Sequence, residues 1–157
     1  MNLHEVFPRN HIIVDLDARR KLDTLREIVA KLAESGAVKK TDIEDVERAV
    51  MRREELGSTG IGKGVAVPHA KHPAVEGVVG VFARSAQGIE FDSLDGQLVH
   101  LVFLLVSSPD AVEPHIEALR KVTLLLRDHD ICMFLKRAST EEELAGLLVE
   151  ADERLAK

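Results

Sequence analysis

The chain has 157 residues, of which 45% are hydrophobic and 31% are charged, a composition typical of one globular domain with a substantial core. Trp and Tyr are absent and only five Phe occur, so we expect a core built mainly from aliphatic side chains. The net charge of −6 provides no basic field to collect phosphate groups, which argues against a nucleic-acid partner or an anionic membrane surface.

Two further features bear on the compartment. The opening stretch, MNLHEVFPRN, lacks the charged head and apolar run of a signal peptide, and the longest apolar run, residues 98–106, is too short to span a bilayer. We therefore expect a cytoplasmic protein with no direct membrane insertion.

The one cysteine, Cys132, lies among apolar residues, which favours a small buried hydrophobic residue over a nucleophile.

Two helices are predicted in the N-terminal part of the chain. Over residues 18–35 apolar side chains recur at steps of three and four, with Asp17 placed to cap the start and Gly36 to end the helix. The second helix is expected to begin at a capping box formed by Thr41 and Glu44 and to stop before the glycine-rich stretch.

Strand patterns follow the glycine-rich stretch. Residues 65–67 form a short β-branched run that ends at Pro68, which cannot donate to a sheet ladder. The runs 78–83 and 98–106 also have strand length, and the second is nearly continuous, as in a strand covered on both faces. A tight turn is expected at Asp95-Gly96 between them.

Helical patterns return in the C-terminal part, over residues 112–127 and again from a capping box at Thr140. Helices therefore precede and follow the strands. This order predicts a single α/β domain over residues 1–157, with a mixed β-sheet and helices packed on both faces.

The glycine-rich stretch GSTGIGKG, residues 57–64, satisfies seven of the eight positions of a nucleotide-binding loop. Its last position is Gly64, where a hydroxyl would have to hold Mg²⁺. A nucleotide loop also needs a strand before it and a helix after it, and the order predicted here is the reverse. We therefore expect the glycines to form a turn.

The residues that flank this turn are candidates for chemistry. His69 follows the predicted strand on a segment stiffened by proline, and Arg53 lies near the end of the preceding helix, so the turn would bring imidazole and guanidinium together. A histidine beside a fixed cation, with the hydroxyls of Ser58 and Thr59 nearby, can accept a phosphoryl group and have its charge stabilised. From the residues alone, a histidine that closes a strand without any chemistry remains the alternative.

His69 and His72 also have a spacing found in zinc sites. A third ligand is missing nearby and the chain has a single cysteine, so we expect no bound metal.

The segment RREELGSTGIGKGVAVPHAK, residues 52–71, resembles the active-site segment of a known family. This family comprises the IIA domains of the fructose–mannitol–nitrogen-regulatory branch of the bacterial phosphoenolpyruvate-dependent phosphotransferase system. Its pattern runs from an acidic residue, here Glu54, to an aliphatic-Ala-aliphatic-Pro-His sequence and a small residue, here Ala70, where glycine is more usual. The segments IEFDSLDGQLVHLVFLLVSSP and PHIEALRKVTLLLRD resemble further parts of the family, so the likeness covers nearly the whole chain.

The resemblance implies a function for each candidate residue. His69 would accept a phosphoryl group, through Nε2, from the phosphohistidine of an HPr-like carrier, and would pass it on, often to a IIB domain. Arg53 would neutralise the phosphoryl oxygens, and His115 would hydrogen-bond them or orient His69. Thr59 or Ser58 would complete the cradle, and no metal or other cofactor is implied.

Two functional classes fit this chemistry, and both act as phosphotransferases through a phosphohistidine. The first is a nitrogen-regulatory phosphocarrier that controls a target protein through its phosphorylation state. It is favoured because the chain carries no attached IIB or IIC segment and because its first and last helices look like those of the regulatory members. The alternative is a fructose- or mannitol-type component of sugar uptake that passes phosphate to a separate IIB domain.

Overall fold

The nearly continuous apolar run forms the central strand β6 (Val99–Ser107), in which every residue except His100 is buried. In the computed structural model, which describes residues 1–156, β6 pairs antiparallel with β5 (Val78–Ile89) on one side. On its other side it pairs parallel with β3 (Val65–Ala66) and β4 (His69–Lys71). The longest apolar run of the sequence therefore has neighbours on both edges.

The two edges of the sheet are short strands. β1 (Ile12–Ile13) pairs parallel with β5, and β2 (Gly60–Gly62) pairs antiparallel with β3. The strand order β1-β5-β6-β3-β2, with β4 also on β6, mixes parallel and antiparallel pairs. The predicted mixed sheet is thus confirmed.

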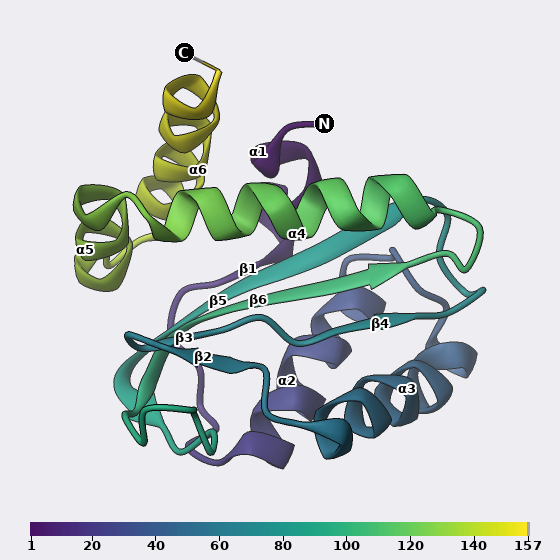
Figure 1. Cartoon of the computed structure of the whole chain (residues 1–157). Helices are drawn as coiled ribbons and strands as arrows, with labels where there is room; N and C mark the ends of the chain where they lie inside the picture. Colours follow the sequence, from purple (N-terminus) through teal and green to yellow (C-terminus); the bar gives the residue numbers. More distant parts are fainter. Residues whose placement is uncertain (157) are drawn as a thin grey trace.

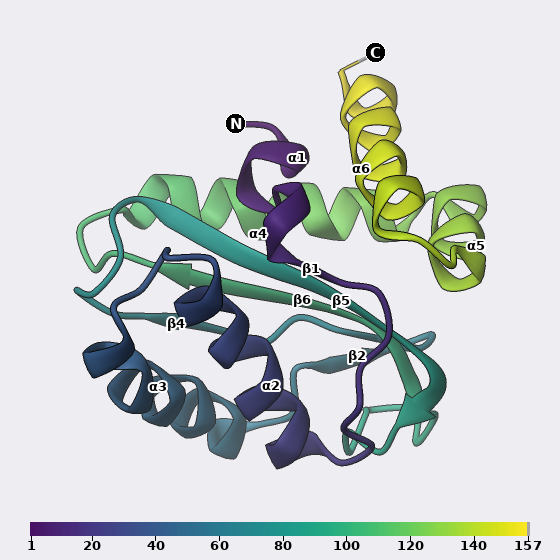
Figure 2. The same ribbon diagram turned by 180° about the vertical axis from the view of Figure 1, so that it is seen from behind.

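Helices cover both faces of this sheet, as predicted (Figures 1 and 2). α2 (Lys21–Glu34) and α3 (Ile43–Leu56) lie on one face. The other face carries α1 (Leu3–Val6), α4 (Val112–Leu126), α5 (His129–Arg137) and α6 (Glu141–Leu155). Two short 3₁₀ turns, η1 (Arg9–His11) and η2 (Lys40–Asp42), complete the described elements.

The alternation of side chains along β6 divides the core into two halves. Leu101, Phe103 and Leu105 point to the face covered by α4, α5 and α6. Their neighbours Val102 and Leu104 point to the face covered by α2 and α3. None of the helices in residues 1–156 is long and apolar enough to cross a bilayer.

α2 begins three residues later than the sequence predicted. The segment before it stays extended because Arg20 forms a parallel bridge with Glu90. Asp17 does not cap the helix, because the later start puts Arg20 at the N-cap position. The predicted end is confirmed, with Gly36 in a left-handed conformation (φ +83°).

The two predicted capping boxes had different outcomes. The box at Thr41 is wrong, because Thr41 lies inside the 3₁₀ turn η2 and α3 starts without a side-chain cap. The box at Thr140 is confirmed, since its Oγ1 accepts a hydrogen bond from the Glu143 N–H at 3.1 Å. The sequence did not predict α5, which Asp128 caps by accepting from the Ile131 N–H at 3.2 Å.

The glycine-rich stretch forms a β-hairpin followed by strands, as expected of a turn and not of a nucleotide loop. β2 and β3 are joined by Lys63 and Gly64, whose φ angles of 58° and 80° match a type I′ turn. The chain then bends through Val67 and Pro68, and both β3 and β4 pair with β6. The predicted strand over 65–67 is therefore shorter, and His69 opens β4 instead of following the end of a strand.

Candidate functional site

His69 is half-buried, and each of its ring nitrogens contacts a neighbour. Nδ1 lies 2.8 Å from the carbonyl oxygen of Val67. Because a carbonyl oxygen can only accept, Nδ1 carries the proton. Nε2 lies 3.3 Å from Nε of Arg53, which donates to it. The geometry therefore selects one tautomer, in which Nε2 holds a lone pair.

Arg53 reaches His69 from the last turn of α3. Its Nη1 also donates to the carbonyl oxygen of Gly57 at 3.0 Å, where the helix ends. The guanidinium is thus held at two points, and its permanent charge lies beside the unprotonated nitrogen of His69.

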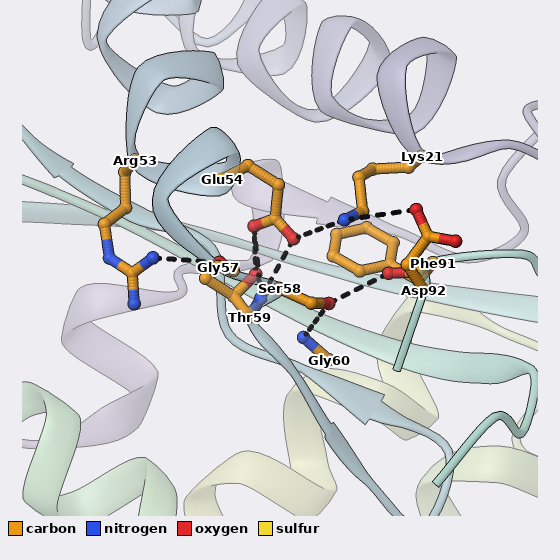
Figure 3. A network of polar contacts seen from close by, with 9 residues as sticks. All are labelled: Lys21, Arg53, Glu54, Gly57, Ser58, Thr59, Gly60, Phe91 and Asp92. Atoms are coloured by element: carbon orange, nitrogen blue, oxygen red, sulfur yellow. Dashed lines mark hydrogen bonds and ion pairs between the residues drawn. The ribbon is translucent and has the colours of Figure 1, made fainter. Parts of the chain in front are cut away.

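The next residue, Glu54, points to the other side of the helix, into a network of polar contacts (Figure 3). Its side chain is 3% exposed, and its carboxylate accepts hydrogen bonds from the Thr59 N–H at 2.9 Å and the Thr59 hydroxyl at 2.6 Å. It also lies 3.1 Å from Nζ of Lys21, which is 3.6 Å from Asp92. The network ties the start of α2 and the end of α3 to the following loop, so it fixes the backbone from which Arg53 projects.

Ser58 and Thr59, which the resemblance placed in the cradle, use their hydroxyls inside this loop. Thr59 is buried and donates to Glu54. Ser58 donates to the carbonyl oxygen of Phe91 at 2.9 Å and accepts from the Gly60 N–H at 3.1 Å. The structure does not bring either hydroxyl to the depression around His69, whose lining contains neither residue.

His115 joins His69 from the first turn of α4. The two ring centroids lie 5.7 Å apart, and His115 is buried. Its Nδ1 lies 2.5 Å from Oγ of Ser107, the last residue of β6. In the register of the sheet Ser107 pairs with Lys71, two residues beyond His69. The end of β6 therefore places Ser107 near His69, and α4, which follows β6 in the chain, begins beside it.

Burial lowers the pKa of both histidines. For His69, burial is the largest cause and the charge of Arg53 acts in the same direction, while the Val67 carbonyl and Glu54 oppose it. For His115, burial is again the largest cause, with contributions from His69 and Lys71. Both rings are therefore neutral near pH 7, which keeps the lone pair of His69 Nε2 available.

An open depression surrounds the two histidines, and its charge is positive. It is lined by the cationic side chains Arg52, Arg53 and Lys71 and by no carboxylate. Charged hydrogen-bond donors of this kind suit an anion with several oxygens, such as a phosphoryl group.

His72 takes no part in this cluster. Its Nε2 lies 2.5 Å from a carboxylate oxygen of Asp45 on α3, and its Nδ1 accepts from the Ala74 N–H at 3.0 Å. The pair that the sequence spacing suggested for zinc is thus split between two places. Residues 1–156 contain no group of three His, Cys, Asp or Glu side chains placed to hold a metal ion.

Sequence reasoning did not assign a role to Lys21, Glu54 or Ser107. The family pattern includes an acidic residue at Glu54, which was a signal for its importance but not for its partners. Ser107 could have been noticed as the first polar residue after the long apolar run. Lys21 carried no signal, because its partner lies 33 positions further along the chain.

Comparison with known proteins identifies the family. The model of the family "Phosphoenolpyruvate-dependent sugar phosphotransferase system, EIIA 2" matches residues 5–151. The chain belongs to this EIIA 2 family.

Proteins similar to the chain carry names from both functional classes that the sequence suggested. A nitrogen regulatory protein of Bradyrhizobium diazoefficiens is 38% identical over 137 residues, which cover 87% of this chain and 88% of that protein. The fructose-specific EIIABC component of Bacillus subtilis is 33% identical over 152 residues, or 97% of this chain, but the chain spans only 24% of its length.

A solved structure similar to this chain has the same architecture. The crystal structure of the nitrogen regulatory protein IIA-Ntr from Neisseria meningitidis has a TM-score of 0.83 and 32% sequence identity, and the match covers 93% of this chain and 98% of that one. The resemblance seen in the sequence is therefore confirmed at the levels of family and fold.

Proposed function

We propose that this chain is a phosphohistidine carrier of the nitrogen-regulatory type, in which His69 Nε2 accepts a phosphoryl group from an HPr-like carrier protein. The observation that carries the proposal is the tautomer of His69. Its Nδ1–H is bound to the Val67 carbonyl, so the lone pair is left on Nε2 beside Arg53. Membership of the EIIA 2 family and the 38% identity to a nitrogen regulatory protein support it.

The transfer needs no base to activate His69. The Nε2 lone pair attacks the phosphorus of the donor phosphohistidine, and the Nε2–P bond forms as the donor P–N bond breaks. The electron pair of the broken bond returns to the donor ring, which changes from a protonated phosphohistidine to a neutral imidazole. His69 becomes the cationic, phosphorylated ring, and the Val67 carbonyl continues to hold its Nδ1 proton.

Arg53 and His115 stabilise the phosphoryl group in this proposal. The Arg53 N–H that donates to Nε2 in the free protein turns to the phosphoryl oxygens once Nε2 is bonded to phosphorus. We assign the Ser107 hydroxyl, 2.5 Å from Nδ1 of His115, as the donor of that hydrogen bond. The proton of the His115 ring then lies on Nε2, from which it can donate to a phosphoryl oxygen. Ser58 and Thr59 contribute indirectly, because they hold the loop that follows Arg53.

Positioning is the main contribution of the protein, because the bonds broken and formed are of the same kind. The phosphoryl group can then be passed to a partner, or the phosphorylated chain can act as a signal for a target protein. The sugar-uptake alternative, with transfer to a separate IIB domain, is kept because the Bacillus subtilis fructose component is 33% identical to the chain.

The phosphoacceptor can be tested by incubation with phosphoenolpyruvate, enzyme I and an HPr-like carrier. We expect one acid-labile phosphate per chain, and none in the His69→Ala variant. His72→Ala is the matched control, because this histidine lies three residues away but faces Asp45, and it should be labelled normally. Persistent labelling of His69→Ala would contradict the assignment.

The two classes can be separated with the phosphorylated chain. A regulatory carrier should retain its phosphate in the presence of purified fructose- and mannitol-type IIB domains. Rapid transfer to either domain would favour the sugar-uptake alternative.

A further inference from the structure

A second depression, separate from the one around His69, lies between the β2–β3 hairpin, the C-terminal end of α4 and α5. Its volume is about 560 Å³, within the range of small-molecule sites. It shares no lining residue with the depression around His69. The two lie towards opposite ends of α4, since His115 is in its first turn and Leu126 ends it.

The floor of this second depression is apolar. It is formed by Ile61 and Val65 of the hairpin, Leu126 of α4, and Cys132 and Met133 of α5. Ile61 is 48% exposed and Met133 is 38% exposed, so apolar surface from two separate elements faces the same space without a cover. Burial raises the pKa of the Cys132 thiol, which therefore adds a neutral surface to this floor.

The rim carries basic side chains and no acidic one. The lining includes five of them, namely Lys63, Arg127, His129, Lys136 and Arg137, and it includes no Asp or Glu. None of the four Lys and Arg side chains of this rim forms an ion pair with a carboxylate in residues 1–156. This is unusual in a chain whose net charge is −6, because its acidic residues outnumber the basic ones.

Asp130, which follows His129, is exposed and is not part of the lining. Two other acidic residues beside the rim are engaged elsewhere. Asp128 pairs with Arg154 at 2.8 Å and caps α5. Asp95 accepts from the backbone N–H groups of Lys63 and Gln97, at 2.9 and 3.1 Å. Neither carboxylate is therefore directed at the side chains of the rim.

One contact holds the two walls together. Nζ of Lys136 on α5 donates to the carbonyl oxygen of Lys63 in the hairpin turn at 3.0 Å. An ammonium group has three N–H donors, so two remain for another acceptor. The separation of the hairpin from α5 is thus set before any ligand arrives.

We propose that this depression binds a small organic anion with an apolar tail. The tail would cover the floor formed by the hairpin, α4 and α5, and the anionic group would face the arginines and lysines of the rim. Guanidinium groups match the geometry of carboxylate and phosphate oxygens, and the uncovered apolar floor selects against inorganic anions. This site does not depend on the phosphocarrier function proposed above.

Octanoate is a suitable probe, with titration followed by two-dimensional ¹H–¹⁵N NMR spectra of the full chain. We expect saturable shifts confined to residues 61–65 and 123–137, with affinity that weakens as salt is added. The Arg127→Gln/Arg137→Gln variant, which alters two exposed side chains, should bind octanoate at least about tenfold more weakly. The Lys39→Gln/Lys40→Gln variant is the matched control, because it makes the same change in net charge on the other side of the sheet, and it should bind normally.

Several results would overturn the proposal. These are no saturable shifts up to about 10 mM octanoate, equal affinity in the two double variants, or 1-octanol binding as tightly as octanoate. Shifts centred on His69 and Arg53 would also overturn it, since they would place the anion in the other depression.

Discussion

The Lys21–Glu54 ion pair leads to a stability prediction whose size follows from burial. The Glu54 side chain is 3% exposed and that of Lys21 is 17% exposed, with 3.1 Å between Nζ and the carboxylate oxygen. The change to test is Lys21→Met, which keeps an unbranched apolar side chain but removes the charge, including the ammonium group that lies 5.3 Å from the centroid of the Phe91 ring. It would leave the Glu54 carboxylate buried without its cation.

Removing one partner of a buried ion pair costs about 3–5 kcal/mol of unfolding free energy. Lys21 keeps some contact with water, and Glu54 retains its two hydrogen bonds from Thr59, so we expect the lower end, about 3 kcal/mol. For a chain of this length that corresponds to a fall in melting temperature of about 6–12 °C. Thermal unfolding followed by circular dichroism, with urea titration as a check, measures both quantities.

Lys31→Met is a matched control on the same helix. Lys31 is 19% exposed and pairs with Glu34 at 3.2 Å, but Glu34 is 72% exposed. Because that carboxylate stays in water, we expect a loss of at most about 0.5 kcal/mol. If Lys21→Met is no more destabilising than Lys31→Met, the burial argument is wrong.

A double variant separates charge from packing. In Lys21→Met/Glu54→Gln the buried charge is gone and the amide oxygen still accepts from Thr59, so about half or more of the lost stability should return. A double variant as unstable as Lys21→Met would show that the uncompensated charge is not the cause.

Three further predictions concern the histidine cluster. Because burial, and secondly the charge of Arg53, lowers the pKa of His69, the fall of phosphoryl acceptance on acidification should have its midpoint below about pH 6.5, the ordinary histidine value. A midpoint above about pH 7 would contradict this. Arg53→Lys should slow acceptance by about 10- to 100-fold, because an ammonium cannot reproduce the donors of the guanidinium, and an unchanged rate would remove Arg53 from the reaction. Ser107→Ala should cost about 1 kcal/mol of stability and slow transfer, because His115 loses the partner of its Nδ1. A Ser107→Ala variant with normal transfer would exclude that orienting role.

The long-range periodic patterns of the sequence predicted most of the architecture. The apolar run at 98–106 is nearly the extent of β6, and its lack of alternation predicted layers on both faces. Short elements were missed because their structure depends on partners far along the chain. β2 contains two glycines and has no strand propensity of its own, so it becomes a strand only because β3 pairs with it.

Dependence on partners far along the chain also limited what could be predicted about the site. The predicted turn in the glycine-rich stretch, with Arg53 near the end of the preceding helix and His69 after Pro68, was enough to place imidazole and guanidinium together. The partner of the Ser58 hydroxyl could not be predicted, because its acceptor, the Phe91 carbonyl, lies 33 residues away. The tautomer of His69 depends on the orientation of the Val67 carbonyl, which only the folded backbone sets.

The most direct test of this account is NMR of the phosphorylated chain with ¹⁵N-labelled histidines. Coupling between phosphorus and a ring nitrogen identifies the bonded atom, and histidine variants assign the ring. We predict a single phosphorus–nitrogen coupling, to Nε2 of His69, with the Nδ1 proton still bound to the Val67 carbonyl. A phosphoryl group on Nδ1 of His69, or on His115, would contradict the central claim.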